Sequence, residues 1–239
     1  MGERLTIPGH LARGPRRSED QATDEAVWLI DHLCSSVGLA DLGDAAVLDY
    51  GCGVRFTQAF LNRGLPIGRY VGVDVARDLV QFLQQNVDDP RFEFHWIDTH
   101  NDRYNPDGER LTPTTPLPLD ERFDVICLYS VLTHLAPDDT AALLALLRRY
   151  VAPDGHLLFS IFLDDGNRES GGLMDRIAQR TEPLPVAPFR DLLPDEPLKW
   201  AVYSEPYARE LVTAAGWTVA RVGLPVPPYI QHHLVCAPA

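Results

Sequence analysis

Short apolar runs alternate along the chain with stretches in which apolar residues recur every three or four positions. The apolar runs are bounded by turn residues, as is typical of buried strands; they are 46–50, 70–74, 91–97, 123–128 and 156–163. The stretches with the spacing of amphipathic helices are 21–38, 56–63, 76–87 and 139–150. Strands that alternate with helices predict a doubly wound α/β fold around a mostly parallel sheet.

The C-terminal end departs from this alternation. Ser204 is placed to cap a helix that continues through Ala215 and ends at Gly216. Two apolar runs follow, at 217–223 and 231–236. We expect them to form a terminal antiparallel hairpin that closes the sheet.

Three stretches lie outside this pattern. Residues 1–20 carry clustered charge and predict a flexible N-terminal arm, which leaves 21–239 as a single domain. Residues 105–121 are rich in proline and predict a loop between the third and fourth strands. Residues 164–203 follow the fifth strand, so they should lie over the carboxyl edge where ligands bind. They are either a substrate cap or a mobile surface excursion, and we favour the cap.

Charge and cysteine content exclude several classes of function. The 239 residues carry a net charge of −13, which argues against a nucleic-acid partner because phosphate contacts need a basic patch. The four cysteines are scattered without a C-x-x-C pair, so we expect no metal site and no disulfide framework. The N-terminus lacks the apolar run of a signal peptide, and no stretch could span a bilayer. We therefore expect a cytoplasmic protein.

The richest motif is Val-Leu-Asp-Tyr-Gly-Cys-Gly at 47–53, where the first strand meets a turn. Gly51 and Gly53, on either side of Cys52, lack the Cβ atom that would keep backbone and ligand apart. A dinucleotide-binding turn has a third Gly or Ala where this chain has Phe56, which argues against a nicotinamide oxidoreductase.

An acidic residue, Asp49, stands two positions before this turn. With the Gly-x-Gly sequence it resembles the opening motif of class I S-adenosylmethionine-dependent methyltransferases, whose cofactor offers such an acid a positively charged amino acid end. The resemblance implies a seven-stranded Rossmann-like sheet. Those enzymes usually carry a third glycine where this chain has Arg55. The Arg55 guanidinium could contact the cofactor carboxylate, pair with Asp49 or Asp74, or lie in solvent.

Acids at the ends of the next two strands extend the resemblance. Asp74 follows Gly53 by 21 positions (74 − 53) and would accept both ribose hydroxyls, with Val75 beside it. Its alternative role is a helix N-cap. The resemblance implies that Asp98 accepts the adenine amino group and that the Thr99 N–H meets a ring nitrogen; otherwise Asp98 is a turn residue.

The fourth strand and its exit, Phe-Asp-Val-Ile-Cys-Leu-Tyr-Ser-Val-Leu-Thr-His-Leu at 123–135, resemble bacterial small-molecule methyltransferases. The resemblance implies that three consecutive residues flank the methionine part of the cofactor: Leu128, Tyr129 and Ser130. Such enzymes align an acceptor with the sulfonium methyl group and exclude water. The sequence therefore predicts methyl transfer to a small-molecule acceptor, with a hydroxyl of a sugar, glycolipid or secondary metabolite as the expected site.

A hydroxyl acceptor needs a base. His134 follows the fourth strand and is the first candidate, although it could instead order the loop. His232 is the second candidate, because the start of an antiparallel last strand lies near the site; alternation allows only one of His232 and His233 to face it. Five aromatic residues could shape an acceptor pocket: Tyr104, Trp200, Tyr203, Tyr207 and Tyr229. The overall acidity favours neutral or cationic acceptors.

The main alternative is a domain that binds S-adenosylmethionine in a structural or regulatory role without methylating. Arg55 and the lack of a decisive base keep this alternative open. The acceptor, the oligomeric state and the choice between His134 and His232 do not follow from the sequence.

Overall fold

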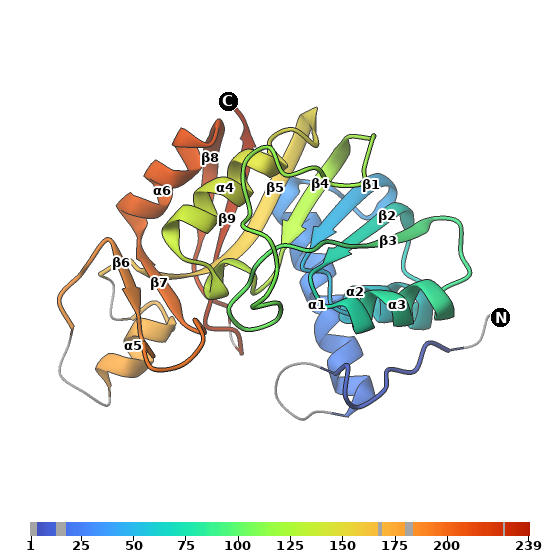
Figure 1. The fold of residues 1–239 in the computed structure, drawn as a ribbon, viewed down its shortest axis with the longest axis horizontal. Helices are drawn as coiled ribbons and strands as arrows, with labels where there is room; N and C mark the ends of the chain where they lie inside the picture. Colours follow the sequence, from blue (N-terminus) through green and yellow to red (C-terminus); the bar gives the residue numbers. More distant parts are fainter. Residues whose placement is uncertain (1–3, 13–17, 167–168, 180–183, 227) are drawn as a thin grey trace.

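The computed structural model describes residues 4–12, 18–166, 169–179, 184–226 and 228–239 (Figure 1). Its α-helices are α1 (Glu19–Val37), α2 (Arg55–Arg63), α3 (Arg77–Asn86), α4 (Pro137–Leu147), α5 (Leu173–Ala178) and α6 (Glu205–Ala214). Its strands are β1 (Leu42–Tyr50), β2 (Ile67–Asp74), β3 (Phe92–Trp96), β4 (Phe123–Leu128), β5 (Val151–Asp164), β6 (Phe189–Asp191), β7 (Ala201–Ser204), β8 (Trp217–Gly223) and β9 (His232–Pro238). A short 3-10 helix, η1 (Leu132–His134), follows β4.

The strands form one mostly parallel sheet, as the alternation predicts. β3, β2, β1, β4 and β5 are parallel neighbours in that order. β9 pairs antiparallel with β5, and β8 pairs antiparallel with β9, so the expected terminal hairpin is confirmed. The seven expected strands are all present, and the described residues add two short ones, β6 and β7.

The two added strands arise because β5 changes its partner part-way along. Residues Leu157 to Ile161 of β5 pair with β9, whereas Phe162 to Asp164 pair in parallel with β7. Asp164 and Ser204 are register partners, so the two ends of the segment 164–203 lie side by side. This segment was expected to lie outside the sheet because β6 and β7 are only three and four residues long and give no periodic signal.

Helices cover both faces of the sheet (Figure 1). α1, α2 and α3 pack on one face, in a core to which Val47 of β1 contributes. α4 and α6 pack on the other face, in a core to which the next residue, Leu48, contributes. Successive side chains of a strand point to opposite faces, so every central strand serves both cores. This arrangement is the doubly wound α/β fold.

The ends of α6 and the start of α4 lie close to where the sequence predicts them. The Ser204 hydroxyl accepts a hydrogen bond from the Tyr207 N–H, and Gly216 follows α6 with φ 83°. α4 begins at Pro137, two residues before its expected start, because proline suits the first turn of a helix.

The described part of the N-terminal segment is packed rather than separate. Leu5 and Leu11 are buried, and the Gln58 side chain donates to the Leu5 carbonyl oxygen at 3.1 Å. The other residues of the expected flexible arm, 1–3 and 13–17, lie outside the described residues.

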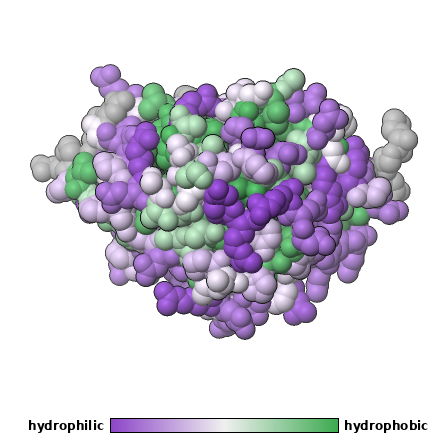
Figure 2. Space-filling model, turned by 90° about the horizontal axis from the view of Figure 1, so that it is seen from above, coloured by the Kyte–Doolittle hydropathy of each residue, from purple (hydrophilic) through white to green (hydrophobic). Residues whose placement is uncertain are grey.

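The C-terminus lies at the amino edge of the parallel strands, because β9 runs against β5. Figure 2 views the molecule from this side and shows hydrophilic residues interspersed with small hydrophobic patches. The opposite edge, where β1, β2 and β4 end, holds the candidate site. Among the described helices none has both the length and the apolar character needed to cross a membrane.

Candidate active site

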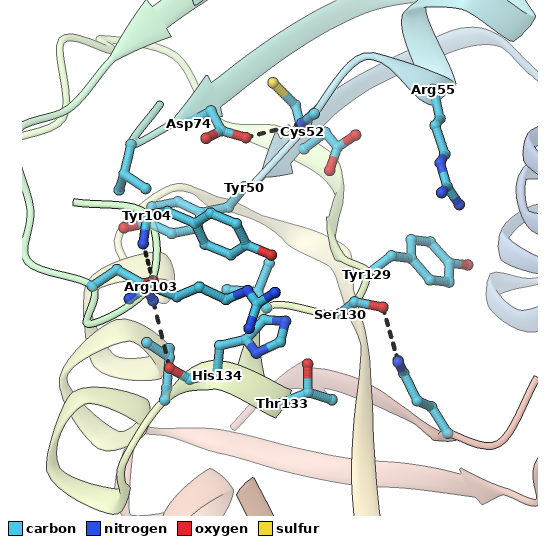
Figure 3. Close-up of a pocket in the computed structure, with 18 of the residues that line it drawn as sticks. Tyr50, Cys52, Arg55, Asp74, Arg103, Tyr104, Tyr129, Ser130, Thr133 and His134 are labelled. Atoms are coloured by element: carbon cyan, nitrogen blue, oxygen red, sulfur yellow. Dashed lines mark hydrogen bonds between the residues drawn. The ribbon is translucent and has the colours of Figure 1, made fainter. Parts of the chain in front are cut away.

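A cavity of about 650 Å³ opens at the carboxyl edge of the sheet. The ends of β1 and β2, the loop between β3 and β4, η1, and the residues before β9 all contribute to its wall. Ten of its residues are labelled in Figure 3. Ligands of doubly wound sheets bind at this edge, where adjacent strands diverge.

The Gly-x-Gly turn forms one wall of the cavity, and both glycines have backbone angles that favour glycine. Gly51 has φ 77° and Gly53 has φ 53°. A Cβ atom at Gly51 would lie 2.5 Å from Cγ2 of Val131, whereas one at Gly53 would meet nothing within 4 Å. Cys52 between them also lines the cavity. Arg55 lines it too and is the first residue of α2, a position with ordinary helical backbone, so a third glycine is not needed there.

Asp49 is a buried acid in this wall. Its carboxylate accepts a hydrogen bond from the Tyr70 hydroxyl at 2.6 Å. Burial raises the pKa of Asp49 from 3.8 to about 7, against the opposing effect of hydrogen bonds from Tyr70 and Cys127. An acid that is costly to ionise when the cavity holds no cation is suited to a positively charged ligand group.

Asp74 is held by backbone groups on both sides. Its carboxylate accepts from the Gly53 N–H at 3.0 Å and from the Ala76 N–H at 2.9 Å. These bonds tie the end of β2 to the Gly-x-Gly turn at the end of β1. Asp74 and its neighbour Val75 line the cavity, but the N-cap of α3 is Ala76, so Asp74 is not the cap.

Asp98 and Thr99, the two residues predicted to bind adenine after β3, lie in different environments. Thr99 is buried and lines the cavity. Asp98 is exposed and lies outside the lining, and its carboxylate accepts from the Asn105 side chain at 3.0 Å. The structure therefore does not bring Asp98 to the site, because its side chain lies at the surface against Asn105, whereas that of Thr99 is buried in the cavity wall.

Two of the three residues expected from β4 reach the cavity. Tyr129 and Ser130 line it, whereas Leu128 is fully buried behind them. Ser130 has φ 59°, which is unusual for a residue with a side chain. The Gln231 side chain donates to the Ser130 hydroxyl at 2.9 Å, which ties the end of β4 to the residue before β9.

His134 lies in the same cavity at the end of η1. Its buried Nδ1 has no hydrogen-bond partner among the described residues. Burial, with the nearby charge of Arg103, lowers the pKa of His134 to about 4, although backbone hydrogen bonds with Leu198 and Lys199 oppose this shift. The imidazole is thus neutral at physiological pH and can accept a proton at Nδ1.

The two histidines of β9 lie on opposite faces, as strand alternation predicts, but the choice of His232 as the one facing the site is wrong. His233 lines the cavity and His232 does not. His232 is buried, and its Nε2 lies 3.2 Å from Oδ2 of Asp165. Which of the two histidines faces the cavity depends on the register of β9 with β5, and the sequence does not show this register.

Several residues that line the cavity have no counterpart in the strand-end pattern. Arg103, with Tyr104, comes from the loop between β3 and β4; Thr133 comes from η1; Lys199, with Trp200, comes from the segment before β7. Of the five aromatic candidates, Tyr104, Trp200 and Tyr229 line the cavity, whereas Tyr203 and Tyr207 do not. Across the described residues, no group of three His, Cys, Asp or Glu side chains is arranged to hold a metal ion.

A family model described as a methyltransferase domain matches residues 29–222. The chain belongs to this methyltransferase family. Its sheet order and terminal hairpin also match solved structures. The glycopeptide N-methyltransferase MtfA aligns with a TM-score of 0.58 at 16% identity, over 91% of this chain and 90% of its own. The magnesium protoporphyrin IX methyltransferase ChlM from Synechocystis PCC 6803 aligns with a TM-score of 0.56 at 15% identity, over 95% and 90%.

The methyltransferase is shorter than some of the proteins that it resembles. It covers 54% of the mitomycin 7-O-methyltransferase MmcR, which aligns with a TM-score of 0.56 at 18% identity over 88% of this chain. At these identities the likeness shows the fold alone. Structures of MtfA and ChlM contain S-adenosylhomocysteine, the product left by S-adenosylmethionine after methyl transfer. S-adenosylmethionine is the cofactor of this family.

The residues of the methyltransferase fit this cofactor. Asp49 offers a buried carboxylate to a cationic group, and the turn at Gly53 leaves open space beside the cavity. Asp74 is held at the edge of the same cavity, as a ribose-binding acid must be. The cavity is large enough to extend past these groups to His134, so a second molecule has room beside the cofactor.

Proposed function

We propose that this methyltransferase transfers the methyl group of S-adenosylmethionine to a hydroxyl of a small molecule. The observation that carries the proposal is the position of His134, which lines the same cavity as Asp49 and Asp74 and whose buried Nδ1 has no hydrogen-bond partner among the described residues. A proton acceptor in the same enclosed space as the cofactor residues is what a hydroxyl acceptor requires.

The chemistry needs alignment and one proton transfer. Bound S-adenosylmethionine would supply the methyl group and a sulfur leaving group, and His134 would take the proton of the acceptor hydroxyl. Asp49, Asp74 and the Gly-x-Gly turn fix the cofactor end of the reaction. Buried apolar groups such as Leu135 and Phe162 help to exclude water from the cavity.

We also propose that 21–239 acts as one domain with 164–203 as its acceptor cap. Phe162 just before this segment, and Arg176, Lys199 and Trp200 within it, line the cavity and support this assignment. The net charge of −13 supports a small-molecule acceptor rather than a nucleic acid. A cytoplasmic location remains a prediction from the sequence.

The test has two stages. Calorimetry with S-adenosylhomocysteine measures the cofactor site, and release of S-adenosylhomocysteine from S-adenosylmethionine measures methyl transfer to a panel of phenols, sugars and other hydroxyl compounds. His134→Gln should lower kcat by about 10²–10⁴-fold, because a positioned base contributes that much. The same variant should leave the affinity for S-adenosylhomocysteine within about twofold, since His134 is placed on the acceptor side.

Each stage can contradict the proposal separately. No binding of S-adenosylhomocysteine would refute the cofactor site itself. Binding without release of S-adenosylhomocysteine on any hydroxyl compound would instead favour the structural or regulatory domain that the sequence left open. An unchanged kcat in His134→Gln would remove His134 as the base.

A further inference from the structure

The lining of the cavity has a charge opposite to that of the chain. Four basic residues contribute to the lining: Arg55, Arg103, Arg176 and Lys199. The acidic residues of the lining are Asp49 and Asp74, both at the cofactor-side ends of strands. Because the Debye length is about 8 Å at physiological salt, a ligand in the cavity responds to these local charges rather than to the net charge of −13.

Two of these cations lie next to the candidate base. The charges of Arg103 and Lys199 both act on the imidazole of His134, although they come from segments almost one hundred residues apart. Figure 3 shows the Arg103 side chain reaching toward His134, with Thr133 beyond it. Arg103 and Lys199 are far apart in the sequence but lie close to the same imidazole, so two separate loops form this part of the site.

These cations are packed on aromatic rings and form no ion pair with the described carboxylates. The Arg103 guanidinium lies 5.6 Å from the ring centre of Tyr104, and the Lys199 ammonium lies 5.6 Å from that of Trp200. Neither cation forms a salt bridge with an acid in the described part of the chain. Stacking on an aromatic ring holds a cation in place and leaves its hydrogen-bond donors available to a ligand.

Unpaired polar atoms lie beside the cations. Thr133 is 1% exposed, and its hydroxyl, like Nδ1 of His134, has no hydrogen-bond partner among the described residues. Both residues line the cavity. Burying a polar group without a partner is unfavourable, so these atoms indicate a place where a ligand supplies the missing bonds.

We propose that the acceptor carries an acid group, a carboxylate or a phosphate, which Arg103 and Lys199 bind next to His134 and Thr133. The proposal rests on the proposed function and names the class of acceptor for the same site. Guanidinium and ammonium donors form charge-assisted hydrogen bonds with such oxygens, and the Thr133 hydroxyl can add one more. Tyr104 and Trp200 would then contact the apolar body of the acceptor.

The acid group also has a consequence for the base. Its negative charge would offset the positive charges that lower the pKa of His134, so a bound acid would make the imidazole a better proton acceptor. A neutral analogue of the same shape would lack this effect. We therefore expect an acid to be preferred both in binding and in turnover.

The first part of the test uses the protein loaded with S-adenosylhomocysteine and three probes of similar size: benzoate, phenyl phosphate and benzamide. At least one anion should bind about tenfold more tightly than benzamide by ligand-observed NMR, and the tighter of the two identifies carboxylate or phosphate as the recognised group. The Arg103→Gln and Lys199→Gln variants should each lose most of this preference.

Arg110→Gln is the matched control, since Arg110 lies in the same loop as Arg103 but outside the cavity lining, with its side chain 79% exposed. It should keep the full preference. All three variants should bind S-adenosylhomocysteine like the wild type, which shows that the fold and the cofactor site are intact.

Three outcomes would overturn the proposal alone while S-adenosylhomocysteine still binds: equal binding of benzamide and both anions, no binding of either anion at tens of millimolar, or a preference that both cavity variants retain. Failure of S-adenosylhomocysteine to bind would instead overturn the proposed function, and with it the acceptor class.

Discussion

Asp49→Asn is expected to stabilise the protein while it weakens cofactor binding. The carboxyl of Asp49 is 4% exposed, and burial raises its pKa from 3.8 to about 7. An asparagine has the same shape, carries no charge, and can still accept the hydrogen bond that Tyr70 donates at 2.6 Å. The substitution therefore removes the cost of ionising a buried acid and keeps the local packing.

The pH dependence follows from the direction of this shift. Well below pH 3.8 Asp49 is protonated in both the folded and the unfolded state, and it imposes no ionisation cost. As the pH rises toward 7, the unfolded state ionises first, so the folded state loses stability, and the loss is complete above about pH 7. A shift of about 3 pKa units corresponds to at most about 4 kcal/mol.

The unfolding free energy should therefore be higher in Asp49→Asn than in the wild type by about 1–4 kcal/mol at about pH 8, and by less than about 1 kcal/mol at about pH 4. Urea unfolding at both pH values measures this difference. The contributions of the other carboxyl groups to the pH dependence cancel in this difference, because both proteins contain those groups. The exposed Asp120→Asn is the control and should change stability by less than about 0.5 kcal/mol at either pH.

A difference that stays flat between these pH values, or a variant that is less stable at about pH 8, would refute the reasoning. Cofactor binding gives an independent check. A cationic cofactor group should hold Asp49 ionised, so S-adenosylmethionine should bind more tightly as the pH rises from about 6 to 8 and should release protons on binding. The Asn variant should show neither effect.

Three further predictions concern the same edge of the sheet. Asp74→Ala should weaken S-adenosylmethionine binding by about 30–150-fold in calorimetry, because the proposed bidentate contact with the ribose hydroxyls would be lost; a change below about threefold would contradict this role. Gly51→Ala should lower the unfolding free energy by about 2 kcal/mol or more, since its φ of 77° is unfavourable and its Cβ would lie 2.5 Å from Val131; wild-type stability in urea would contradict it. Tyr203→Phe should lower the unfolding free energy by about 1–3 kcal/mol in the same assay. The Tyr203 hydroxyl donates to the Leu135 carbonyl oxygen at 2.6 Å, and without it this buried oxygen loses its donor. The argument fails if the variant unfolds at the wild-type midpoint.

The strand ends are the part of the site that the sequence predicts well. Asp49, Asp74 and Thr99 each follow an apolar run, and parallel strands bring their carboxyl ends to one edge, so a local pattern is enough to group them. The same rule predicts the glycine turn, since positive φ angles and close approach demand glycine.

The acceptor side follows no such rule. Arg103 and Lys199 lie in loops of irregular backbone, and only tertiary packing brings them to His134. The prediction for Asp98 fails for a related reason, because its side chain is held at the surface by Asn105 of the loop, and only the next residue, Thr99, lines the cavity. Net charge is also a misleading guide, since the acidic residues that dominate the total lie mostly outside the cavity.

The pairing of Asp164 with Ser204 bears on how acceptor preference can evolve. The chain leaves the sheet at Asp164 and re-enters it at Ser204, so the two ends of the intervening segment are fixed next to each other. Replacing it with a shorter or longer insert changes the loop-closure entropy only slightly. Because β9 pairs with β5 only up to Ile161, such an exchange leaves the cofactor half untouched. New inserts at this position would thus alter the acceptor side of the cavity, including the contacts of Leu198 and Lys199 with His134, and keep the strand ends that carry Asp49 and Asp74.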